Sequence, residues 1–292
     1  MEIGDTVVRR SYDKDVTFKV IDIKNEDGEE IYVLKGINIR IIADSRDEDL
    51  IKVEDASVGE KDKILNARVS TAIKRAVILR EDNIALDEVD TRSKNQKKKS
   101  ERDLIFGRPG KILHIDGDNE YLETCLKVYK QLELEAIGVQ IPEDKQPDLI
   151  VDLVKQYKPD IVVLTGHDAI NKGAKDLLNI DNYKNSKYYI ESVRRLRNYN
   201  SSYDELVIFA GACQSCYESL LEAGANFASS PSRVLIHCLD PVFVCEKIAY
   251  TKIDKITSLS EIIDGTITGV KGVGGLQTRG KYREGYPKSS YI

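Results

Sequence analysis

The sequence has no long apolar run and few cysteines. Its longest apolar runs, Ile161 to Leu164 and Leu206 to Ala210, fall far short of the roughly 20 residues that a membrane helix needs. The opening residues MEIGDTVVRR are charged and have no apolar core before a small-residue cleavage site, so we expect no secretory signal. Five cysteines are an odd number in a chain of 292 residues. We therefore expect free thiols rather than a disulfide scaffold.

The remaining composition is that of a globular protein. Hydrophobic residues make up 41% of the chain and charged residues 32%, which argues against disorder throughout. The length allows one large domain or two ordinary ones. Because the formal net charge is −5, we expect no nucleic-acid partner, and the short apolar runs predict no membrane partner.

Residues 1–55 predict a small β module. Apolar residues alternate with polar ones in three runs, and the turn-forming pair Asp27-Gly28 separates the first run from the second. The alternating apolar residues are Val16, Phe18, Val20, Ile31, Val33, Ile37, Ile39 and Ile41. The pattern predicts a short antiparallel barrel similar to SH3-like modules.

Residues 56–103 predict a helix followed by a basic linker. Apolar residues recur at every fourth position between charged ones, at Leu65, Val69, Ile73 and Val77. This spacing predicts an amphipathic helix over about 57–82. The segment 91–102, TRSKNQKKKSER, has no apolar residue and is rich in Lys and Arg. We interpret it as a solvated linker that precedes a separate domain.

Residues 104–292 alternate between apolar strands and helical stretches. Strands are predicted at 111–115, 135–141, 160–165, 205–210 and 233–237. Helices are predicted near 119–132, 146–157, 188–199, 214–223 and 241–250. Near-continuous apolar strands between amphipathic helices predict an α/β domain with a mainly parallel sheet that is covered on both faces.

In such a domain, functional residues gather where the parallel strands end. The residues that follow the predicted strands include Asp116, Asp118, Gly166, His167, Asp168, Ala212, Cys213, Cys238 and Asp240. His167 and Cys213 each follow a long apolar strand. Because neighbouring strands lie about 4.8 Å apart, these two side chains can come within proton-transfer reach.

The chemistry of a His and Cys pair is that of nucleophilic catalysis. An adjacent imidazole lowers the pKa of a thiol and favours the reactive thiolate. Cys213 also precedes the predicted helix at 214–223, whose free N–H groups favour an anion. Backbone groups at Gly166, Asp168 and Ala212 are candidates for binding the oxyanion of a tetrahedral intermediate.

Other interpretations of the same residues remain open. Cys213 and Cys216 form a C-x-x-C motif, which near βαβ structure can be a thiol-disulfide redox pair. A zinc site from His167, Cys213, Cys216 and His237 or Cys238 is conceivable, although the spacings match no compact zinc motif. The Asp116-Gly-Asp118 sequence is ordinary turn chemistry that could also line a pocket for a basic substrate. We predict no metal and no cofactor.

The spacing of His167 and Cys213 resembles that of caspase-type cysteine peptidases. These enzymes carry the Cys in a Gln-Ala-Cys context with the His roughly 50 residues upstream, and here Cys213 follows Gly211-Ala212. The resemblance implies a caspase-like three-layer domain. It departs from the caspase pattern in two places: Asp168 follows the His where caspases have Gly, and Gly211 stands where Arg-specific relatives often have an acid.

Over nearly all its length the sequence resembles the YabG family, the sporulation-specific cysteine peptidases of spore-forming Firmicutes. The similar segments are GDTVVRRSYDKDVTFKV, HIDGDNEYL, VVLTGHDA, GACQSCYESLLEAGANFASSPSRV and GVGGLQTRGKYREGYPKS. The resemblance implies cleavage of spore-coat and cortex-regulating proteins after Arg, in the mother-cell cytoplasm and the forming spore coat. It implies that Cys213 is the nucleophile and His167 the general base.

The residues that would select Arg are open at this point. Asp116, Asp118, Asp168 and Asp240 share the predicted strand-end rim and are candidates for binding a basic side chain. If the enzyme prefers Arg or Lys, the segment 91–102 is expected to be a site of self-cleavage. The alternative from another class is a non-enzymatic spore-coat scaffold that binds a partner through its β module.

Overall fold

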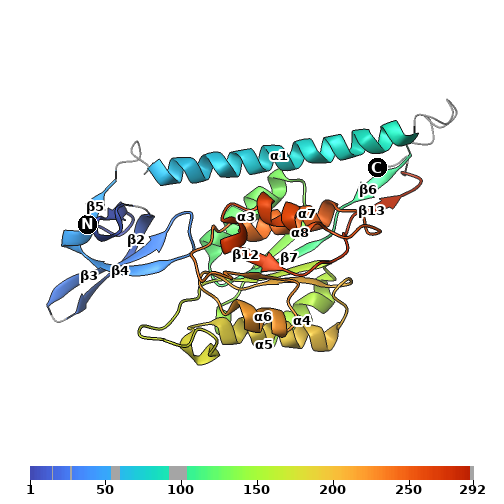
Figure 1. Cartoon of the computed structure of the whole chain (residues 1–292). Helices are drawn as coiled ribbons and strands as arrows, with labels where there is room; N and C mark the ends of the chain where they lie inside the picture. Colours follow the sequence, from blue (N-terminus) through green and yellow to red (C-terminus); the bar gives the residue numbers. More distant parts are fainter. Residues whose placement is uncertain (15, 27, 54–59, 92–103, 290–292) are drawn as a thin grey trace.

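Two β-sheets organise the chain, which is a mixed α/β molecule (Figure 1). We describe it from a computed structural model that covers residues 1–14, 16–26, 28–53, 60–91 and 104–289. An antiparallel sheet forms the N-terminal part, and a mainly parallel sheet forms the centre of the remainder. The expectation of an α/β protein is therefore confirmed.

The N-terminal sheet, which we call the β module, has the strand order β4-β3-β2-β1-β5. Its strands are β1 Thr6–Arg9, β2 Thr17–Glu26, β3 Glu29–Gly36, β4 Ile42–Arg46 and β5 Leu50–Lys52. Alternate apolar side chains such as Val7, Val20 and Leu34 form its core. All neighbouring strands are antiparallel, as the alternation predicts. Closure into an SH3-like barrel stays a prediction.

One alternating run of the module does not join the sheet. The alternation of Ile37, Ile39 and Ile41 predicts a strand, but residues 37–41 leave the sheet between β3 and β4. Ile39 instead forms an isolated antiparallel bridge with His237 in the C-terminal part of the chain. The segment thus pairs with a distant loop rather than with its own sheet.

A long helix connects the two parts. Helix α1 spans Glu60–Thr91, which extends past the predicted end near residue 82. Its predicted apolar stripe faces inward, because Leu65, Val69 and Ile73 pack against the core of the second sheet. The predicted basic segment 91–102 begins with the last residue of α1, and the rest of it lies outside the described residues.

The second sheet has the order β12-β11-β10-β9-β7-β8, in which β12 is antiparallel to its neighbour and the other pairs are parallel. Its strands are β7 Ile112–Asp116, β8 Ala136–Gln140, β9 Ile161–Thr165, β10 Val207–Ala210, β11 Phe227–Ser229 and β12 Val273–Gly275. The central strands β7, β9 and β10 are wholly buried, which explains their continuous apolar sequences.

Helices cover both faces of this sheet, so the domain has three layers (Figure 1). They are α3 Asn119–Gln131, α4 Gln146–Tyr157, α5 Ser186–Tyr199, α6 Tyr217–Glu222, α7 Asp240–Tyr250 and α8 Leu259–Gly265. Helices α3, α7 and α8 lie on one face with α1, and α4, α5 and α6 lie on the other. The likeness of this domain to caspases stays a prediction.

Successive residues of each central strand point into different layers. Ile161 and Val163 belong to the core on the α3 and α7 side, whereas Val162 and Leu164 belong to the core on the α4 and α5 side. A charged substitution at any of these positions would therefore place a charge between sheet and helix.

Short 3₁₀ turns also occur, at Arg10–Tyr12, Asp47–Asp49, Glu143–Lys145, Ile180–Asn182 and Gly269–Lys271.

The strand predicted at 233–237 is wrong. The fifth parallel strand is β11, Phe227–Ser229, which pairs with β10. Left-handed backbone at Ser230 (φ 66°) and Arg233 (φ 54°) then turns the chain out of the sheet. Residues 234–237 therefore form an irregular segment in which Ile236 is buried as it would be in a strand.

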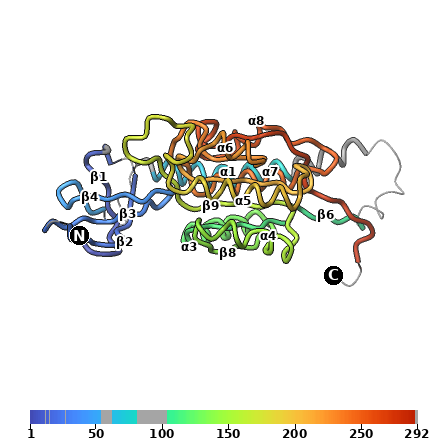
Figure 2. The backbone as a smooth tube through the Cα atoms, turned by 90° about the horizontal axis from the view of Figure 1, so that it is seen from below, coloured from blue at the N-terminus to red at the C-terminus, as the bar shows by residue number. Residues whose placement is uncertain are grey.

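The far end of the molecule carries a small two-stranded sheet. Strand β6, Phe106–Arg108, pairs with β13, Arg283–Gly285, close to the C-terminus. Figure 2 shows the β module at one end of the elongated molecule and β6 at the other. Of the helices in the described part of the chain, none combines the length and the apolar character needed to cross a membrane.

Candidate active site

The predicted site residues follow three neighbouring strands. Strand β9 lies between β7 and β10, and all three are parallel. Their carboxyl ends therefore meet at one edge, where Asp116 and Asp118, His167, and Cys213 occur. The order β8-β7-β9 also reverses direction at β7, which is where open α/β sheets form their crevice.

His167 is held by four neighbours. Its Nε2 lies 2.9 Å from Asp118 Oδ2, and its backbone N–H donates to Glu143 Oε1 at 2.6 Å. Its carbonyl accepts hydrogen bonds from Asn185 Nδ2 at 2.8 Å and from the Tyr189 hydroxyl at 3.2 Å. The other ring nitrogen, Nδ1, is buried and has no hydrogen-bond partner among the described residues. Nδ1 is therefore the nitrogen left for proton transfer.

Asp118 connects the imidazole to the β module. It is the N-cap of α3, where its Oδ1 accepts from the backbone N–H groups of Glu120 and Tyr121. The same oxygen lies 2.7 Å from Lys35 Nζ of strand β3. Burial opposes ionisation of this carboxyl, but hydrogen bonds from His167 and Lys35 lower its pKa to about 2. Asp118 is thus ionised at neutral pH and can orient the imidazole and stabilise its charged form.

Cys213 lies in the loop between β10 and α6 and is only 1% exposed. Its Sγ accepts a hydrogen bond from the Ile236 backbone N–H at 3.2 Å, and burial raises the pKa of the thiol to about 12. Helix α6 begins at Tyr217 rather than at 214, so Cys213 does not gain from a helix N-terminus. In this arrangement the thiol is protonated.

His167 and Cys213 both lie near Tyr121. The ring centre of Tyr121 is 5.8 Å from that of His167, and Cys213 is within electrostatic range of its hydroxyl. Among the described residues there is no hydrogen bond between the thiol and the imidazole. The candidate nucleophile and the candidate base therefore follow adjacent parallel strands, and no hydrogen bond joins their side chains in the described part of the chain.

The Asp168 carboxyl holds the loop that carries Cys213 through hydrogen bonds. The carboxyl is 6% exposed, and it accepts from Ser186 Oγ at 2.5 Å, Ser215 Oγ at 2.9 Å and the Asn185 backbone N–H at 2.7 Å. Ser186 Oγ in turn accepts from the Cys216 backbone N–H at 2.8 Å. The side chain predicted for the substrate rim therefore contacts the two loops that carry His167 and Cys213.

Three backbone N–H groups of the site have no acceptor among the described residues, those of Gly166, Asp168 and Cys213. The first two flank the candidate base, and the third belongs to the candidate nucleophile itself. The N–H of Ala212, also predicted for the oxyanion, donates to Ser215 Oγ at 2.9 Å. Of the predicted oxyanion donors, Gly166 and Asp168 therefore have a backbone N–H without an acceptor in the described part of the chain, as does Cys213, whereas Ala212 does not.

Gly166 contributes by having no side chain. Its φ is +153°, and a Cβ there would lie 2.3 Å from Glu143 Oε1 and 2.8 Å from the Tyr189 hydroxyl. We expect Gly166→Ala to displace Glu143 and the His167 backbone, and to lower kcat/KM for peptide cleavage about 100-fold. Steady-state kinetics on a peptide substrate would measure this loss.

Gly173→Ala is the matched control for Gly166→Ala. Gly173 also has a positive φ of +82°, but a Cβ there meets nothing within 4 Å. It therefore reports the cost of backbone strain without the displacement of Glu143. Equal losses from both substitutions would contradict a positioning role for the space at Gly166.

Asp116 forms a fully buried ion pair with the β module. Its Oδ2 lies 2.6 Å from Arg40 Nη1, and neither side chain is exposed. The carboxyl also accepts from Thr165 Oγ1 and from the Asp118 backbone N–H, each at 2.9 Å. Burial alone would raise the pKa of Asp116, but the Arg40 guanidinium holds it well below its usual range. Asp116 is thus a buried carboxylate that already binds a guanidinium.

Asp240 lies apart from this pair. It is fully buried at the first turn of α7, and it accepts from the backbone N–H groups of Ile267 at 2.7 Å and His237 at 3.2 Å. Burial raises the pKa of Asp240. Its contacts hold the irregular segment 234–237 in place, and no basic side chain reaches it among the described residues.

Sequence reasoning missed Lys35, Arg40 and Glu143. Glu143 follows strand β8 by three residues, so the strand-end rule could have found it. No signal marks Lys35 and Arg40, because they belong to another sheet and to a run that alternates like a strand.

The other chemistries considered for the cysteines can be compared with the structure. All five cysteines are free and buried, so Cys213 and Cys216 are not a disulfide here. No group of three or more His, Cys, Asp or Glu residues that could hold a metal ion occurs in the described part of the chain. Burial and then Arg40 lower the pKa of His237 to about 4.

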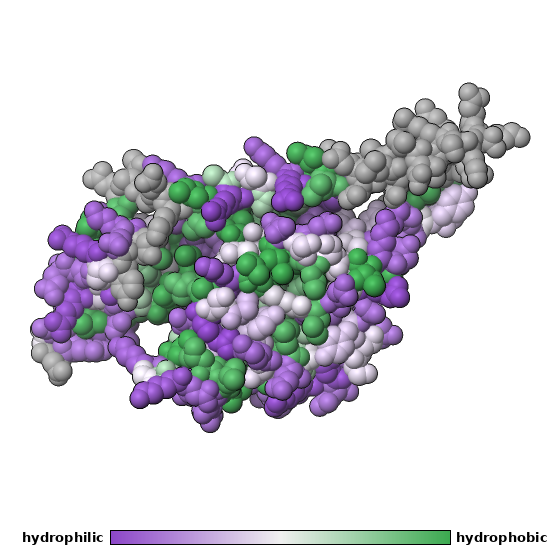
Figure 3. Space-filling view, viewed as in Figure 1, coloured by the Kyte–Doolittle hydropathy of each residue, from purple (hydrophilic) through white to green (hydrophobic). Residues whose placement is uncertain are grey.

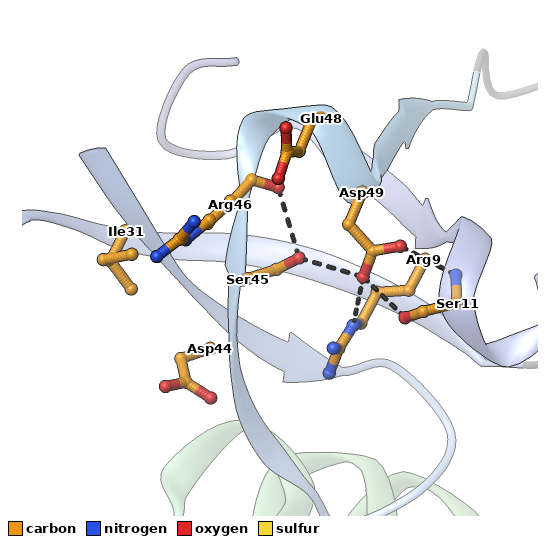
Figure 4. A pocket seen from close by; sticks show the side chains of 8 residues that line it. All are labelled: Arg9, Ser11, Ile31, Asp44, Ser45, Arg46, Glu48 and Asp49. Atoms are coloured by element: carbon orange, nitrogen blue, oxygen red, sulfur yellow. Dashed lines mark hydrogen bonds and ion pairs between the residues drawn. The ribbon is translucent and has the colours of Figure 1, made fainter. Parts of the chain in front are cut away.

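An open pocket of about 440 Å³ lies in the β module instead (Figure 4). Asp49 lines it and accepts from Ser11 and from Arg9 Nε at 3.0 Å. These groups satisfy one another and belong to β1 and to the 3₁₀ turns Arg10–Tyr12 and Asp47–Asp49. None of the residues that line the pocket belongs to the strand-end site.

Two comparisons with known proteins place the whole chain. Residues 2–287 match the model of the family described as YabG peptidase U57. The chain is also 40% identical to the sporulation-specific protease YabG of Bacillus subtilis (strain 168) over 291 residues, which is 99% of each chain. With its fold and strand-end site, the chain therefore belongs to the YabG peptidase family, in which this Bacillus relative is a sporulation-specific protease.

Proposed function

We propose that the chain is a cysteine endopeptidase of sporulation that cleaves proteins after Arg. The observation that supports it most is the hydrogen bond between His167 and the ionised Asp118 at the sheet edge that also carries Cys213. An acid, an imidazole and a thiol on neighbouring strand ends have the parts of a catalytic triad.

The proposed reaction proceeds in two stages. His167 Nδ1 takes the proton of Cys213, and the sulfur attacks the scissile carbonyl carbon to form a tetrahedral intermediate. The N–H groups of Asp168 and Cys213 stabilise its oxyanion. The intermediate collapses to a thioester as His167 protonates the leaving amine, and water then hydrolyses the thioester to release the acid and regenerate the thiol.

Asp116 is the proposed source of a preference for Arg. A buried carboxylate at the sheet edge that also carries Cys213 can pair with a guanidinium, which is planar and forms strong charge-assisted hydrogen bonds. Like Asp168 and Asp240, Asp116 accepts from hydroxyl and backbone donors, but it alone of the three also pairs with a guanidinium, that of Arg40. Asp118 is already engaged by His167 and Lys35.

The proposed substrates are spore-coat and cortex-regulating proteins, processed in the mother-cell cytoplasm and the forming spore coat. The scheme uses no metal and no cofactor. The basic segment 91–102 is a further proposed substrate, and we expect self-cleavage after its Arg or Lys residues. Mass spectra that show this segment intact after long incubation would contradict self-cleavage there.

Sequencing of cleavage sites tests the proposal. We expect a spore-coat protein mixture incubated with the chain to give fragments whose new N-termini follow Arg. The control is the same chain after exhaustive alkylation with iodoacetamide, which should give no fragments. New N-termini after other residues would contradict the specificity.

One observation favours a second candidate, the non-enzymatic scaffold. Cys213 is 1% exposed with a thiol pKa of about 12, as expected for a cysteine that only fills space. An unprocessed coat mixture together with binding to coat proteins would support the scaffold. The thiol-disulfide oxidoreductase is less favoured, because both cysteines of its motif are buried.

A further inference from the structure

Residues 36–41 of the β module, which are the last residue of β3 and the segment that then leaves the sheet, lie against the strand-end site. The carbonyl of Asn38 accepts from the Cys238 backbone N–H at 3.1 Å, and Ile39 forms an antiparallel bridge with His237. The Tyr121 hydroxyl donates to the carbonyl of Ile39 at 2.8 Å. An extended segment that adds to the edge of a fold in this way is a common mode of peptide recognition.

The side chain of Arg40 fills a buried pocket beside this edge. It is 1% exposed and reaches Asp116 at 2.6 Å, with the carbonyl of Cys238 at 3.5 Å from Nη2. The guanidinium also lies 5.0 Å from the ring centre of Tyr121. Because a buried charge is costly without such a partner, this pocket is built for a guanidinium.

The backbone of Arg40 lies at the candidate nucleophile. The Cys213 thiol pairs with the Ile236 backbone, and the backbone of Arg40 lies near enough to this thiol to lower its pKa. Burial outweighs the effect of both contacts, which is why the thiol stays protonated. A substrate cleaved after Arg would place its arginine side chain in a pocket and the backbone of the same residue at the attacking sulfur. Arg40 has this arrangement.

Two further contacts hold the segment in place. Asn38 Nδ2 donates to Asp62 Oδ1 of helix α1 at 2.7 Å, and Lys35 Nζ, just before the segment, lies 2.7 Å from Asp118 Oδ1. Figure 3 shows a gap between part of the β module and the body of the molecule, so docking does not bury all of the facing side. The module is thus attached to the site chiefly through this segment and its neighbours.

We infer that residues 36–41 are an internal substrate mimic that keeps the peptidase latent. Arg40 occupies the pocket of a substrate arginine, and the segment excludes both substrate and solvent from Cys213. The closed state exchanges with an open one, so the intact chain cleaves slowly. This inference rests on the proposed function, because it assigns the occupant of that site.

The rate of alkylation of Cys213 tests directly whether residues 36–41 shield its thiol, and the measurement needs no peptidase activity. We expect Arg40→Ala to raise the rate of modification of Cys213 by iodoacetamide about tenfold or more, as followed by mass spectrometry of the full chain. Cleavage of an Arg-containing peptide should rise in parallel. Arg46→Ala, an exposed arginine of the same module paired with Glu29, is the control and should leave both rates unchanged.

A second variant keeps the test decisive if Arg40→Ala does not fold. Asn38→Asp places a carboxylate against Asp62 and leaves the pocket intact, so it should also release the segment and speed alkylation. If both variants keep the far-UV circular dichroism of the wild type and neither speeds alkylation, the inference is overturned. Cleavage of the Arg40–Ile41 bond in the wild type would also overturn it, because the segment would then be a substrate.

The two proposals fail in different ways. If alkylation becomes faster but no peptide is cleaved, residues 36–41 do shield Cys213, but the proposed peptidase activity is contradicted. The segment then cannot be a substrate mimic. Peptide cleavage by a wild type whose Cys213 is alkylated as fast as in Arg40→Ala would retain the peptidase and remove the cover.

Discussion

Cys213→Ala should abolish peptide-bond cleavage, with a loss of kcat/KM of at least about 10⁴-fold. The reason is that the substitution removes the sulfur that is proposed to attack the scissile carbonyl. Ser215 lies two residues away, but its hydroxyl donates to Asp168 and accepts from the Ala212 N–H. Cleavage of an Arg-containing peptide, followed by the release of its new amine, would measure the loss.

Cys216→Ala is the matched control for this loss. Cys216 is as buried as Cys213, but its Sγ donates to Ser219 Oγ at 3.3 Å within the first turn of α6. The Cys216→Ala variant should keep most of the activity. It should lose only some stability, because the substitution leaves a small cavity. A folded Cys216→Ala protein without activity, beside an active Cys213→Ala protein, would reverse the assignment of the nucleophile.

Asp116→Ala should destabilise the folded chain by about 3–5 kcal/mol, because it leaves the Arg40 guanidinium buried without its carboxylate. The substitution also removes the acceptor of Thr165 Oγ1 and of the Asp118 N–H. Urea unfolding followed by circular dichroism would measure the change in the free energy of unfolding. In the double variant with Arg40→Met, much of the loss should return, because no unpaired charge remains.

Asp148→Ala provides the comparison for that measurement. Asp148 pairs with Arg195 at 2.8 Å, but both side chains are largely exposed. Its loss should cost less than about 1 kcal/mol, as is usual for surface ion pairs. If Asp116→Ala cost no more than this control, the buried pair would not be what holds residues 36–41 against the site.

The elements of the α/β domain were predictable because its packing is repetitive. Strands covered on both faces need continuous apolar sequences, so β7, β9 and β10 lie within one or two residues of their predicted bounds. Helix α4 has the predicted bounds, 146–157. The strand-end rule then placed His167 and Cys213 on adjacent strands without any knowledge of the helices.

The failures come from residues whose partners are distant in the chain. The apolar run 233–237 and the alternation at 37–41 both satisfy the pattern of a strand. They pair with each other across about 200 residues instead, through the bridge between Ile39 and His237. A local pattern records that a segment is extended and apolar, but not which edge it will pair with.

The roles of the rim acids were equally beyond the sequence. Four aspartates share the predicted rim, and their roles follow from the donors that each one meets. Asp118 meets an imidazole and an ammonium group, Asp116 a guanidinium, and Asp168 and Asp240 mainly hydroxyl and backbone groups. These donors come from other strands, loops and the β module, so spacing along the chain cannot distinguish the four.

The length of α1 constrains the kinetic order of self-cleavage. Asp62 contacts Asn38 of the segment 36–41 and lies 29 positions before Thr91 on the same helix. This is a distance of about 44 Å at 1.5 Å per residue. Leu104, on the other side of the basic segment, precedes β6 at the end of the molecule opposite the β module (Figure 2). We therefore expect the proposed self-cleavage in the segment 91–102 to be a reaction between two molecules, whose initial rate rises with the square of the protein concentration.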